Sequence, residues 1–552
     1  MKNEVLISQA SMRNWERLSV NEKDFKSRMT KRANKRFSPK TIIPIEYFSD
    51  SSNLEILNKI LSTKLDVKTV IFSLAKNYIN SNGVSNKYSE KILSEYGQNI
   101  IPNPELLKME LPENEIDFLG IVYQSLLTEG AKNQKGSYYT PQNITQNITE
   151  KIEENSKILD PCCGTGSFLL SLAKKIKNPQ NLYGYDLDEN ACFIAKINLL
   201  VEFRDFEFMP QIFNKDFLLE NNLDEKFDII ATNPPWGAVT AQKYKSLYPL
   251  IKSGESFSYF ILKSESFLNA GGQVYFVLPE SILNVKVHKD IRKFILENFK
   301  IEEIELVGRA FSGVLSKVVL LSLSKNFSTK NILIKNKNKK YEISQEYYLH
   351  NTNYIFSIID NYDVNLLNKI YSIPHEKLDN SSLWAIGIVT GNNKKYISKN
   401  KNLGEKIYSG KNILKNKIIK SDNFINYTRV KFQQVAPDEI YRAKEKLVYK
   451  FISKKLVFAY DNKQRLFLNS ANILIPKLKN YTIKEVMTFL NSRLFQYIYT
   501  KKFNELKVLK GNLMELPFPK YDKNMYPEIS DEIIFKIFNL TENEIKYIKN
   551  ST

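Results

Sequence analysis

The residue types best suited to chemistry stand together directly after an apolar run, FDIIAT, at residues 227–232. Asn233-Pro234-Pro235-Trp236 follow it, and two prolines stiffen a loop because they cannot continue a strand ladder. An aromatic amine is a weak nucleophile, since its lone pair is delocalised into the ring. The Asn233 side-chain oxygen and the Pro234 carbonyl can accept hydrogen bonds from such an amine and aim its lone pair at a methyl sulfonium. If the amine belongs to a nucleic-acid base, Trp236 can stack on the ring of that base. We therefore take Asn233, Pro234, Pro235 and Trp236 as candidate catalytic residues.

A glycine turn lies upstream, in ILDPCCGTGSFLLSLA at residues 158–173. The pattern predicts a strand that ends at Asp160, a turn at Gly164 and Gly166, and an apolar helix. Glycines at such a turn let the backbone approach a ligand closely. Asp186 ends the next expected strand about 20 residues later, where an acidic residue would hold ribose hydroxyls. The loop lacks the third glycine of GxGxxG, which argues against a nicotinamide cofactor.

Asp216 and Phe217 follow a third expected strand. A carboxylate at Asp216 could accept a hydrogen bond from an adenine amino group, and the Phe217 ring could stack on that base. A helix cap is the alternative role for Asp216, because aspartate is a common capping residue. Both interpretations stay open at the level of sequence.

Alternating strands and helices must position these residues. The expected strands cover residues 157–160, 181–186, 227–232, 273–278, 301–307 and 317–323. Strands that alternate with helical segments predict a doubly wound, largely parallel α/β sheet, and ligands bind such sheets at the carboxyl ends of the strands.

Flanking regions differ from this pattern. Residues 1–128 have apolar residues at helical spacing, and 331–552 mix short strands, basic loops and aromatic residues. The sequence KNKNKK at 335–340 is typical of a linker or solvated loop. We predict a helical N-terminal domain at 1–128, a catalytic domain at 129–330 and a mixed α+β C-terminal domain at 331–552.

The overall charge indicates a polyanionic partner. The chain has 80 Lys plus Arg against 60 Asp plus Glu, a formal net charge of +20. Nucleic acid is the common partner of such a protein, although the lysine-rich composition of an AT-rich genome is an alternative cause. With three cysteines in no CxxC pair and three scattered histidines, we expect neither a disulfide framework nor a metal site.

No stretch approaches the roughly 18 continuous apolar residues of a membrane span. The N-terminal sequence MKNEVLISQASMRNWERL lacks the apolar core of a signal peptide. We therefore expect a cytoplasmic protein without a membrane partner.

The order of these motifs resembles that of the γ class of adenine-N6 DNA methyltransferases, the modification enzymes of restriction-modification systems. GSYYTPQNI at residues 136–144 matches the first motif of that family and precedes the DPxCGTG-like loop and NPPW. The resemblance implies a Rossmann-like class I fold, S-adenosylmethionine as cofactor and adenine N6 of a flipped base in double-stranded DNA as target. A separate cognate restriction endonuclease is a possible partner, since the sequence has no convincing nuclease motif.

The resemblance also assigns roles to individual residues. Tyr139 and Thr140 fall on the segment that closes over the methionine end of the cofactor, although Thr140 also fits a helix N-cap. Phe311 falls where the family places a second aromatic against the flipped base, and a core phenylalanine is the alternative. The cofactor positions of the family correspond to Asp160, Gly164, Gly166, Asp186 and Asp216.

The C-terminal part resembles the family's target-recognition domain through WAIGIVTGNNKKYI, YSGKNI and LNSANILIPK. The basic residues that we expect to contact DNA are Lys394, Lys395, Lys411 and Arg429. Three other functions stay open: an RNA or protein-glutamine methyltransferase with the same Asn-Pro-Pro-aromatic motif, a modification subunit that needs a separate specificity protein, and a non-catalytic DNA-binding module.

Overall fold

The computed structural model describes most of the chain, in ten stretches. They are residues 53–112, 115–127, 142–221, 224–237, 242–310, 316–327, 330–337, 339–379, 381–503 and 507–552. Contacts group these residues into two units, one within Met29–Phe356 and one that contains Ser357–Thr552. The division into domains at 1–128, 129–330 and 331–552 stays a prediction.

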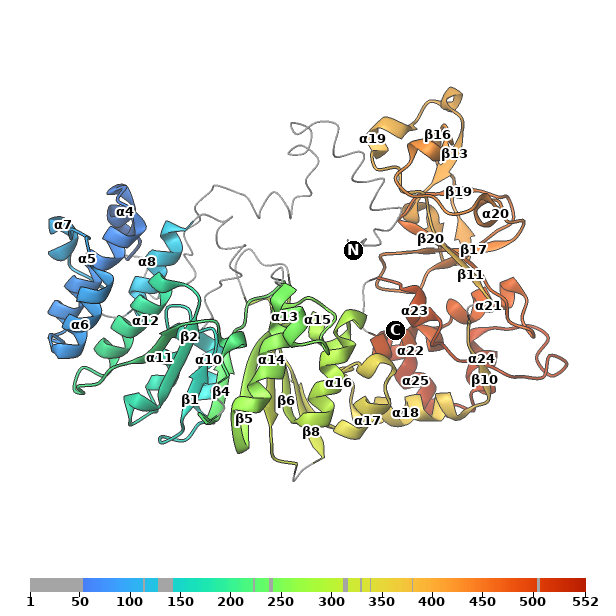
Figure 1. Cartoon of the computed structure of the whole chain (residues 1–552). Coiled ribbons are helices and arrows are strands. Elements are labelled where there is room, and N and C mark those ends of the chain that lie inside the picture. The colour runs from blue at the N-terminus through green and yellow to red at the C-terminus, as the bar shows by residue number, and fades with distance from the viewer. Residues whose placement is uncertain are drawn as a thin grey trace, which may run out of the picture. The chain divides into compact units, whose positions relative to one another are not determined.

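A nine-stranded sheet forms the centre of the first unit (Figure 1). Its strand order is β3-β2-β1-β4-β5-β7-β6-β8-β9. The first five strands in this order are parallel, and β7 runs antiparallel to both of its neighbours. The strands are β1 Ile158–Asp160, β2 Leu182–Asp186, β3 Gln211–Asn214, β4 Phe227–Thr232, β5 Leu268–Pro279, β6 Lys300–Gly308, β7 Val318–Ser324, β8 Asn331–Asn336 and β9 Lys339–Ser344.

The six strands predicted by residue range are confirmed as β1, β2, β4, β5, β6 and β7, and the strand expected before Asp216 is β3. The interpretation of residues 335–340 as a linker was wrong. Lys335 lies in β8 and Lys340 in β9, and the two residues pair in an antiparallel hairpin. The hairpin extends the sheet because β8 pairs in parallel with β6, and its buried residues Ile332, Ile334 and Ile343 supply an apolar face.

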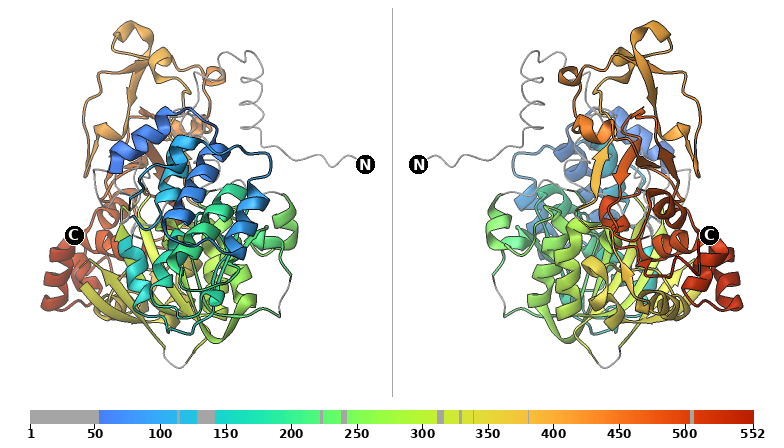
Figure 2. Two further views of the ribbon diagram at one scale, coloured as in Figure 1. Left: turned by 90° about the vertical axis from the view of Figure 1, so that its left-hand side faces the viewer. Right: turned by 90° about the vertical axis from the view of Figure 1, so that its right-hand side faces the viewer.

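Helices cover the sheet and extend beyond the β3 edge. The N-terminal helices α5, α6 and α8 pack against α12, as Figures 1 and 2 show. The helices of this unit are α4 Asn53–Ser62, α5 Val67–Ser81, α6 Lys87–Tyr96, α7 Pro104–Leu107, α8 Phe118–Leu126, α10 Gln142–Thr149, α11 Ser167–Ala173, α12 Glu189–Glu202, α13 Gln242–Leu247, α14 Ser256–Phe267, α15 Ser281–Asn284, α16 Lys289–Asn298 and α17 Gln345–His350, with 3-10 turns η2 Pro179–Asn181, η3 Phe217–Leu219, η4 Lys286–His288 and η5 Thr352–Tyr354.

The packing against α12 makes one continuous core. Val70, Ile71 and Leu74 of α5 belong to the same apolar cluster as Ile194 and Ile197 of α12. The predicted helical character of the N-terminal region is confirmed for its described residues. These helices bury apolar side chains in the same core as the helices that cover the sheet, so the two parts fold as one unit.

The second unit is mixed α+β, as predicted. Its strands are β10 His375–Glu376, β11 Leu383–Ile386, β12 Ile397–Ser398, β13 Glu405–Tyr408, β14 Ile413–Leu414, β15 Lys417–Ile418, β16 Phe424–Ile425, β17 Lys446–Lys450, β18 Phe458–Asp461, β19 Leu466–Phe467, β20 Ala471–Ile475 and β21 Phe518–Pro519. Its helices are α18 Asn361–Ser372, α19 Asn393–Tyr396, α20 Asp438–Tyr441, α21 Ile483–Leu490, α22 Arg493–Phe503, α23 Lys510–Leu513, α24 Asp531–Ile537 and α25 Glu542–Ser551, with 3-10 turns η6 Lys401–Leu403, η7 Gly410–Asn412 and η8 Arg429–Lys431.

Within this unit, α19, β13 and β16 lie at one end and α22, α24 and α25 at the other (Figure 1). The sheet β11-β20-β17-β18 lies between the two ends. A buried ion pair joins two of its strands: Lys446 Nζ lies 2.9 Å from the Asp461 carboxylate, and both side chains are fully buried. Arg465 contacts the same carboxylate at 2.6 Å. Because removing one partner of a buried pair leaves an uncompensated charge, this cluster fixes the pairing of β17 with β18.

Candidate cofactor and catalytic site

The predicted motifs meet at one edge of the sheet. β1 pairs in parallel with β2 on one side and with β4 on the other, and Ile158 lies opposite both Leu182 and Ile229. The carboxyl ends of parallel strands lie at the same edge, so the segments after β1, β2, β3 and β4 emerge side by side. Open α/β sheets bind ligands at this edge, which we call the strand-end edge.

The glycine turn after β1 is bonded to the end of β2. The Gly164 amide donates to Asp186 Oδ2 at 2.9 Å, and the Asp188 amide donates to Oδ1 of the same carboxylate at 2.9 Å. Gly164 and Gly166 have φ angles of +53° and +84°, which favour glycine. A Cβ on Gly164 would meet no atom within 4 Å, whereas one on Gly166 would lie 3.1 Å from Ala195 Cβ of α12. The turn is thus packed against α12 on one side and open on the other.

A hydrogen-bond chain joins this turn to the loop of candidate catalytic residues at Asn233–Trp236, which we call the catalytic loop. Asp160, 1% exposed, accepts bonds from Thr232 Oγ1 at 2.6 Å and from the Cys162 amide at 3.1 Å. The Cys162 thiol lies 2.9 Å from the Thr232 hydroxyl. Burial raises the pKa of Asp160 to about 7 and the pKa of the Cys162 thiol well above its usual value. Since Thr232 immediately precedes Asn233, the ends of β1 and β4 are fixed to each other at the base of the site.

The Asn233–Gly237 loop is anchored along its length. Trp236 donates from Nε1 to the Val277 carbonyl of β5 at 3.2 Å. The Gly237 amide donates to Glu255 Oε2 at 2.6 Å, and Ser256 Oγ donates to the Pro235 carbonyl at 2.6 Å. These bonds set the direction of the loop and the orientation of the indole ring before any ligand arrives.

Asp216 and Phe217 lie at the same edge with different surroundings. Asp216 caps η3 through the Leu218 amide, and its Oδ2 accepts bonds from Lys243 Nζ at 2.8 Å and Tyr244 OH at 2.6 Å. An adenine amino group would have to share this carboxylate with the two α13 side chains. Phe217 is 2% exposed and packs on Tyr185, Phe260 and Phe267. Its ring therefore packs among protein rings, and its stacking on a cofactor base stays a prediction.

Three predicted residues, Tyr139, Thr140 and Phe311, lie outside the described residues. The basic residues predicted to contact DNA all lie in residues 391–431 of the second unit, which we call the basic lobe. Lys394 and Lys395 on α19 and Lys411 on η7 are exposed. Arg429 is half-buried, and its guanidinium lies 2.8 Å from the Asp438 carboxylate.

Other residues of the site were not anticipated. Leu187 is 69% exposed beside Asp186, where an apolar side chain could cover a purine ring next to the ribose. A large apolar residue directly after the acidic strand end is a signal that the sequence offered. Glu255 and Ser256 carry no such signal, because their partners in the catalytic loop lie about 20 residues away in the chain.

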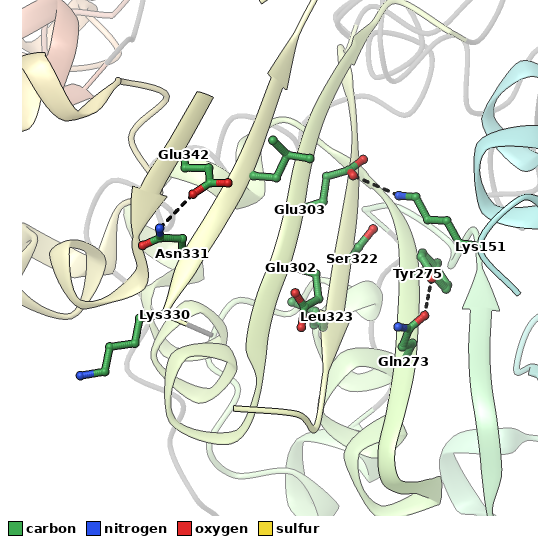
Figure 3. Close-up of a pocket in the computed structure, with 11 residues that line it drawn as sticks. Lys151, Gln273, Tyr275, Glu302, Glu303, Ser322, Leu323, Lys330, Asn331 and Glu342 are labelled. Atoms are coloured by element: carbon green, nitrogen blue, oxygen red, sulfur yellow. Dashed lines mark hydrogen bonds and ion pairs between the residues drawn. The ribbon is translucent and has the colours of Figure 1, made fainter. Parts of the chain in front are cut away.

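A separate cavity of about 750 Å³ lies over β5, β7, β6 and β8 (Figure 3). Its central carboxylate, Glu303, forms ion pairs with Lys151 at 3.0 Å and Lys335 at 2.9 Å. Glu342 accepts a bond from Asn331 at 2.9 Å. None of the predicted site residues lines this cavity, so it is distinct from the strand-end edge. Among the residues that the structure describes, no cluster of three or more His, Cys, Asp or Glu side chains could hold a metal ion.

Comparisons with known proteins agree with this geometry. Residues 114–379 match the N-6 DNA methylase family, and residues 405–518 match the TaqI-like C-terminal specificity domain. The chain is 33% identical over 305 residues to the type II methyltransferase M.VspI of Vibrio sp. (strain 343), an alignment that covers 53% of this chain and 74% of that protein. It is 26% identical over 272 residues to M.HincII of Haemophilus influenzae, which covers 47% of each.

The type IIL restriction-modification enzyme MmeI, solved in complex with DNA, has a similar fold. The TM-score is 0.55 at 13% identity, over 92% of each chain. The sheet order and the strand-end edge define a class I methyltransferase fold joined to a specificity domain. The chain belongs to the N-6 DNA methylase family and is a DNA methyltransferase.

Proposed function

We propose that the protein transfers the methyl group of S-adenosylmethionine to N6 of an adenine flipped out of a specific double-stranded DNA sequence. The observation that carries this proposal is the bonded junction Asp160–Thr232–Cys162. It places the glycine turn and the Asn-Pro-Pro-Trp loop on neighbouring strand ends. A methyl donor at one and an amino group at the other would meet between them.

The chain's own groups fit S-adenosylmethionine at the strand-end edge. The Asp186 carboxylate lies at the end of β2, the Gly164 turn is open on its outer side, and Leu187 is exposed beside them. These residues would hold the ribose, admit the ligand close to the backbone and cover the purine. When bound, the cofactor supplies an electrophilic methyl group on a positively charged sulfur.

The catalytic loop supplies hydrogen-bond acceptors rather than a base or a nucleophile. The Asn233 side-chain oxygen and the Pro234 carbonyl would hold the two amino hydrogens and localise the nitrogen lone pair. Trp236, fixed through Val277, would stack on the extruded base. Extrusion is required because the amino group is not accessible inside the duplex.

The chemistry of cytosine C5 methylation does not fit. It needs a thiolate nucleophile, and Cys162 is the thiol bonded to the strand that carries the catalytic loop. Burial raises its pKa, and its sulfur contacts the Thr232 hydroxyl below the glycine turn. A buried neutral thiol is a poor nucleophile.

The basic lobe supports DNA as the polyanion. Residues 391–431 contain ten lysines and one arginine against one glutamate and one aspartate. All ten lysines are exposed, which suits contacts to phosphates. We further propose a restriction-modification context with a separate cognate endonuclease, and a cytoplasmic location where DNA is accessible. No helix in the described part of the chain is both long and apolar enough to cross a membrane.

The deciding experiment is nucleoside mass spectrometry of duplex DNA treated with the protein and methyl-labelled cofactor. We expect label in N6-methyladenine at one sequence context, and none with Asn233→Ala. Label in N4-methylcytosine or C5-methylcytosine would overturn the target. Parallel reactions with total RNA and with release-factor protein test the alternative substrates, and label only there would overturn DNA as the substrate.

A further inference from the structure

The capping residue of α8 reaches beyond its own helix. Asp117 accepts a bond from the Gly120 amide at 2.9 Å, as an N-cap does. N-cap side chains usually lie at the surface, but Asp117 is fully buried. Its carboxylate also accepts bonds from Thr165 Oγ1 at 2.5 Å and from Asn198 Nδ2 at 2.7 Å. Thr165 lies 48 residues away in the chain, inside the glycine turn.

The glycine turn is held at two atoms of Thr165. Its hydroxyl donates to Asp117, and its carbonyl accepts a second bond from Asn198 Nδ2 at 3.0 Å. The amide group of Asn198 thus binds the carboxylate and the turn together. Thr165 stands between Gly164, whose amide binds Asp186, and Gly166, which caps the start of α11. The position of Thr165 therefore sets the direction of both glycines.

Keeping a carboxylate in this place is costly. Burial raises the pKa of Asp117 to about 7, although the bonds from Thr165, Asn198 and Gly120 lower it. A capping residue at the surface would satisfy the helix without that cost. A buried polar group that is fully bonded restricts its neighbours to one arrangement. Here the bonded Asp117 carboxylate restricts the glycine turn, and Asp186 binds the same turn from the other side.

We infer that Asp117 is a positioning residue of the cofactor site, which acts from the N-terminal helices through Thr165 and Asn198 to hold the glycine turn in its ligand-binding conformation. This inference rests on the proposed function, because it assumes that the turn receives S-adenosylmethionine. Because Asp117 is fully buried, it acts through Thr165 and Asn198 rather than at the ligand surface. The helices before the catalytic sheet are then part of the cofactor site rather than an appendage to it.

The test compares two helix caps in the full-length protein. Asp117→Asn is paired with Asp66→Asn at the N-cap of α5, where an exposed carboxylate accepts a bond from the Thr69 amide of its own helix. Calorimetry measures the Kd of S-adenosylhomocysteine for each, and thermal melting measures stability. We expect Asp117→Asn to raise the Kd at least about tenfold, as when bonds to a charged group are removed. Asp66→Asn should leave the Kd unchanged.

Substitutions of Thr165 keep the inference testable if Asp117→Asn does not fold. Thr165→Val removes the hydroxyl and should raise the cofactor Kd, whereas Thr165→Ser retains the hydroxyl and should restore wild-type affinity. Wild-type affinity in folded Asp117→Asn, or in Thr165→Val, would overturn the inference and leave Asp117 as a helix cap. Failure of the wild-type protein to bind S-adenosylhomocysteine or S-adenosylmethionine would instead contradict the proposed function.

Discussion

The strand-end edge and the basic lobe organise charge in opposite ways. At the edge, the carboxylates of Asp160 and Asp186 each accept one bond from a neighbouring segment and one from an amide two residues further along the chain. In the lobe, ten exposed lysines lie on short strands, short helices and turns. Methyl transfer needs atoms held within fractions of an ångström, whereas contacts to phosphates position a protein through many similar charges. The difference accords with the proposed roles, methyl transfer at the edge and contact with a long polyanion at the lobe.

The largest effect is expected from a variant that impairs the strand-end edge and leaves the basic lobe unchanged. Asn233→Ala removes one of two acceptors for the amino group, and we expect turnover to fall by about 10²–10³-fold or more, as for loss of a preorganised polar group. The affinities for cofactor and DNA should not change measurably. Single-turnover methylation measures the turnover, and binding isotherms with cofactor and with DNA measure the two affinities. Asn269→Ala is the matched control, because the Asn269 side chain donates a hydrogen bond to Asp228 at the amino ends of β5 and β4, away from the strand-end edge.

Asp186→Ala should weaken the cofactor site next. Loss of a charge-assisted hydrogen bond costs about 1.5–3 kcal/mol, or roughly 10–150-fold in affinity. Titration calorimetry with S-adenosylhomocysteine tests this, and DNA binding should not change. Asp228→Ala removes a carboxylate that also accepts two bonds, from the Lys157 amide and Asn269, but at the start of β4. Equal loss in both variants would mean that Asp186 acts only through stability.

Removing positive charge from the basic lobe should affect DNA binding and leave the cofactor site unchanged. In the triple variant Lys394→Ala, Lys395→Ala, Lys411→Ala, we expect weaker DNA binding. The slope of log K against log salt should become shallower by about 0.9 for each phosphate that the protein no longer neutralises. Cofactor affinity should stay at the wild-type value. Fluorescence anisotropy at several salt concentrations measures the slope.

The control for this variant replaces three exposed lysines at the other end of the same unit, namely Lys536, Lys546 and Lys549. Because both triple variants change the net charge equally, only the position of the lysines differs. A slope that changes as much in the control would assign the effect to overall charge and leave the lobe without a special role.

The smallest effect concerns the stability of the first unit at acidic pH. His288 is 3% exposed, and burial lowers its pKa to about 4. Between about pH 6.5 and 4 the unfolded chain binds a proton that the folded chain does not. This group therefore removes stability as the pH falls through that window. His288→Leu should flatten the pH dependence of urea unfolding there relative to wild type, with little change at pH well above that window. An unchanged profile would mean that His288 is protonated in the folded protein.

The sequence predicted the central strands because each is a short apolar run that ends at a polar residue, as β1 does at Asp160 and β4 before Asn233. It did not predict β8 and β9. These strands include Lys335, Lys339 and Lys340, and strands of such composition resemble loops. A strand with one solvated face is recognised only when its partner is known.

The residues of the site also divide into those that the sequence predicted and those that it did not. Motifs predicted the catalytic loop and the glycine turn, because the residues of each are adjacent in sequence. The roles of Asp117, Glu255 and Val277 depend on partners 48, 18 and 41 residues away. No local pattern contains those pairings. Phe217 illustrates a further limit, since its packing on three protein rings is not visible in the sequence and its contact with the cofactor adenine stays a prediction.

The hairpin that completes the nine-stranded sheet also bears on solubility. An open sheet leaves an unpaired backbone at its last strand, which a strand of another molecule could extend. β9 is that last strand, and its exposed Lys339, Lys340 and Glu342 would bring charge into any such intermolecular pairing. The lysine-rich composition that made β9 resemble a loop in the sequence thus also disfavours aggregation along this edge.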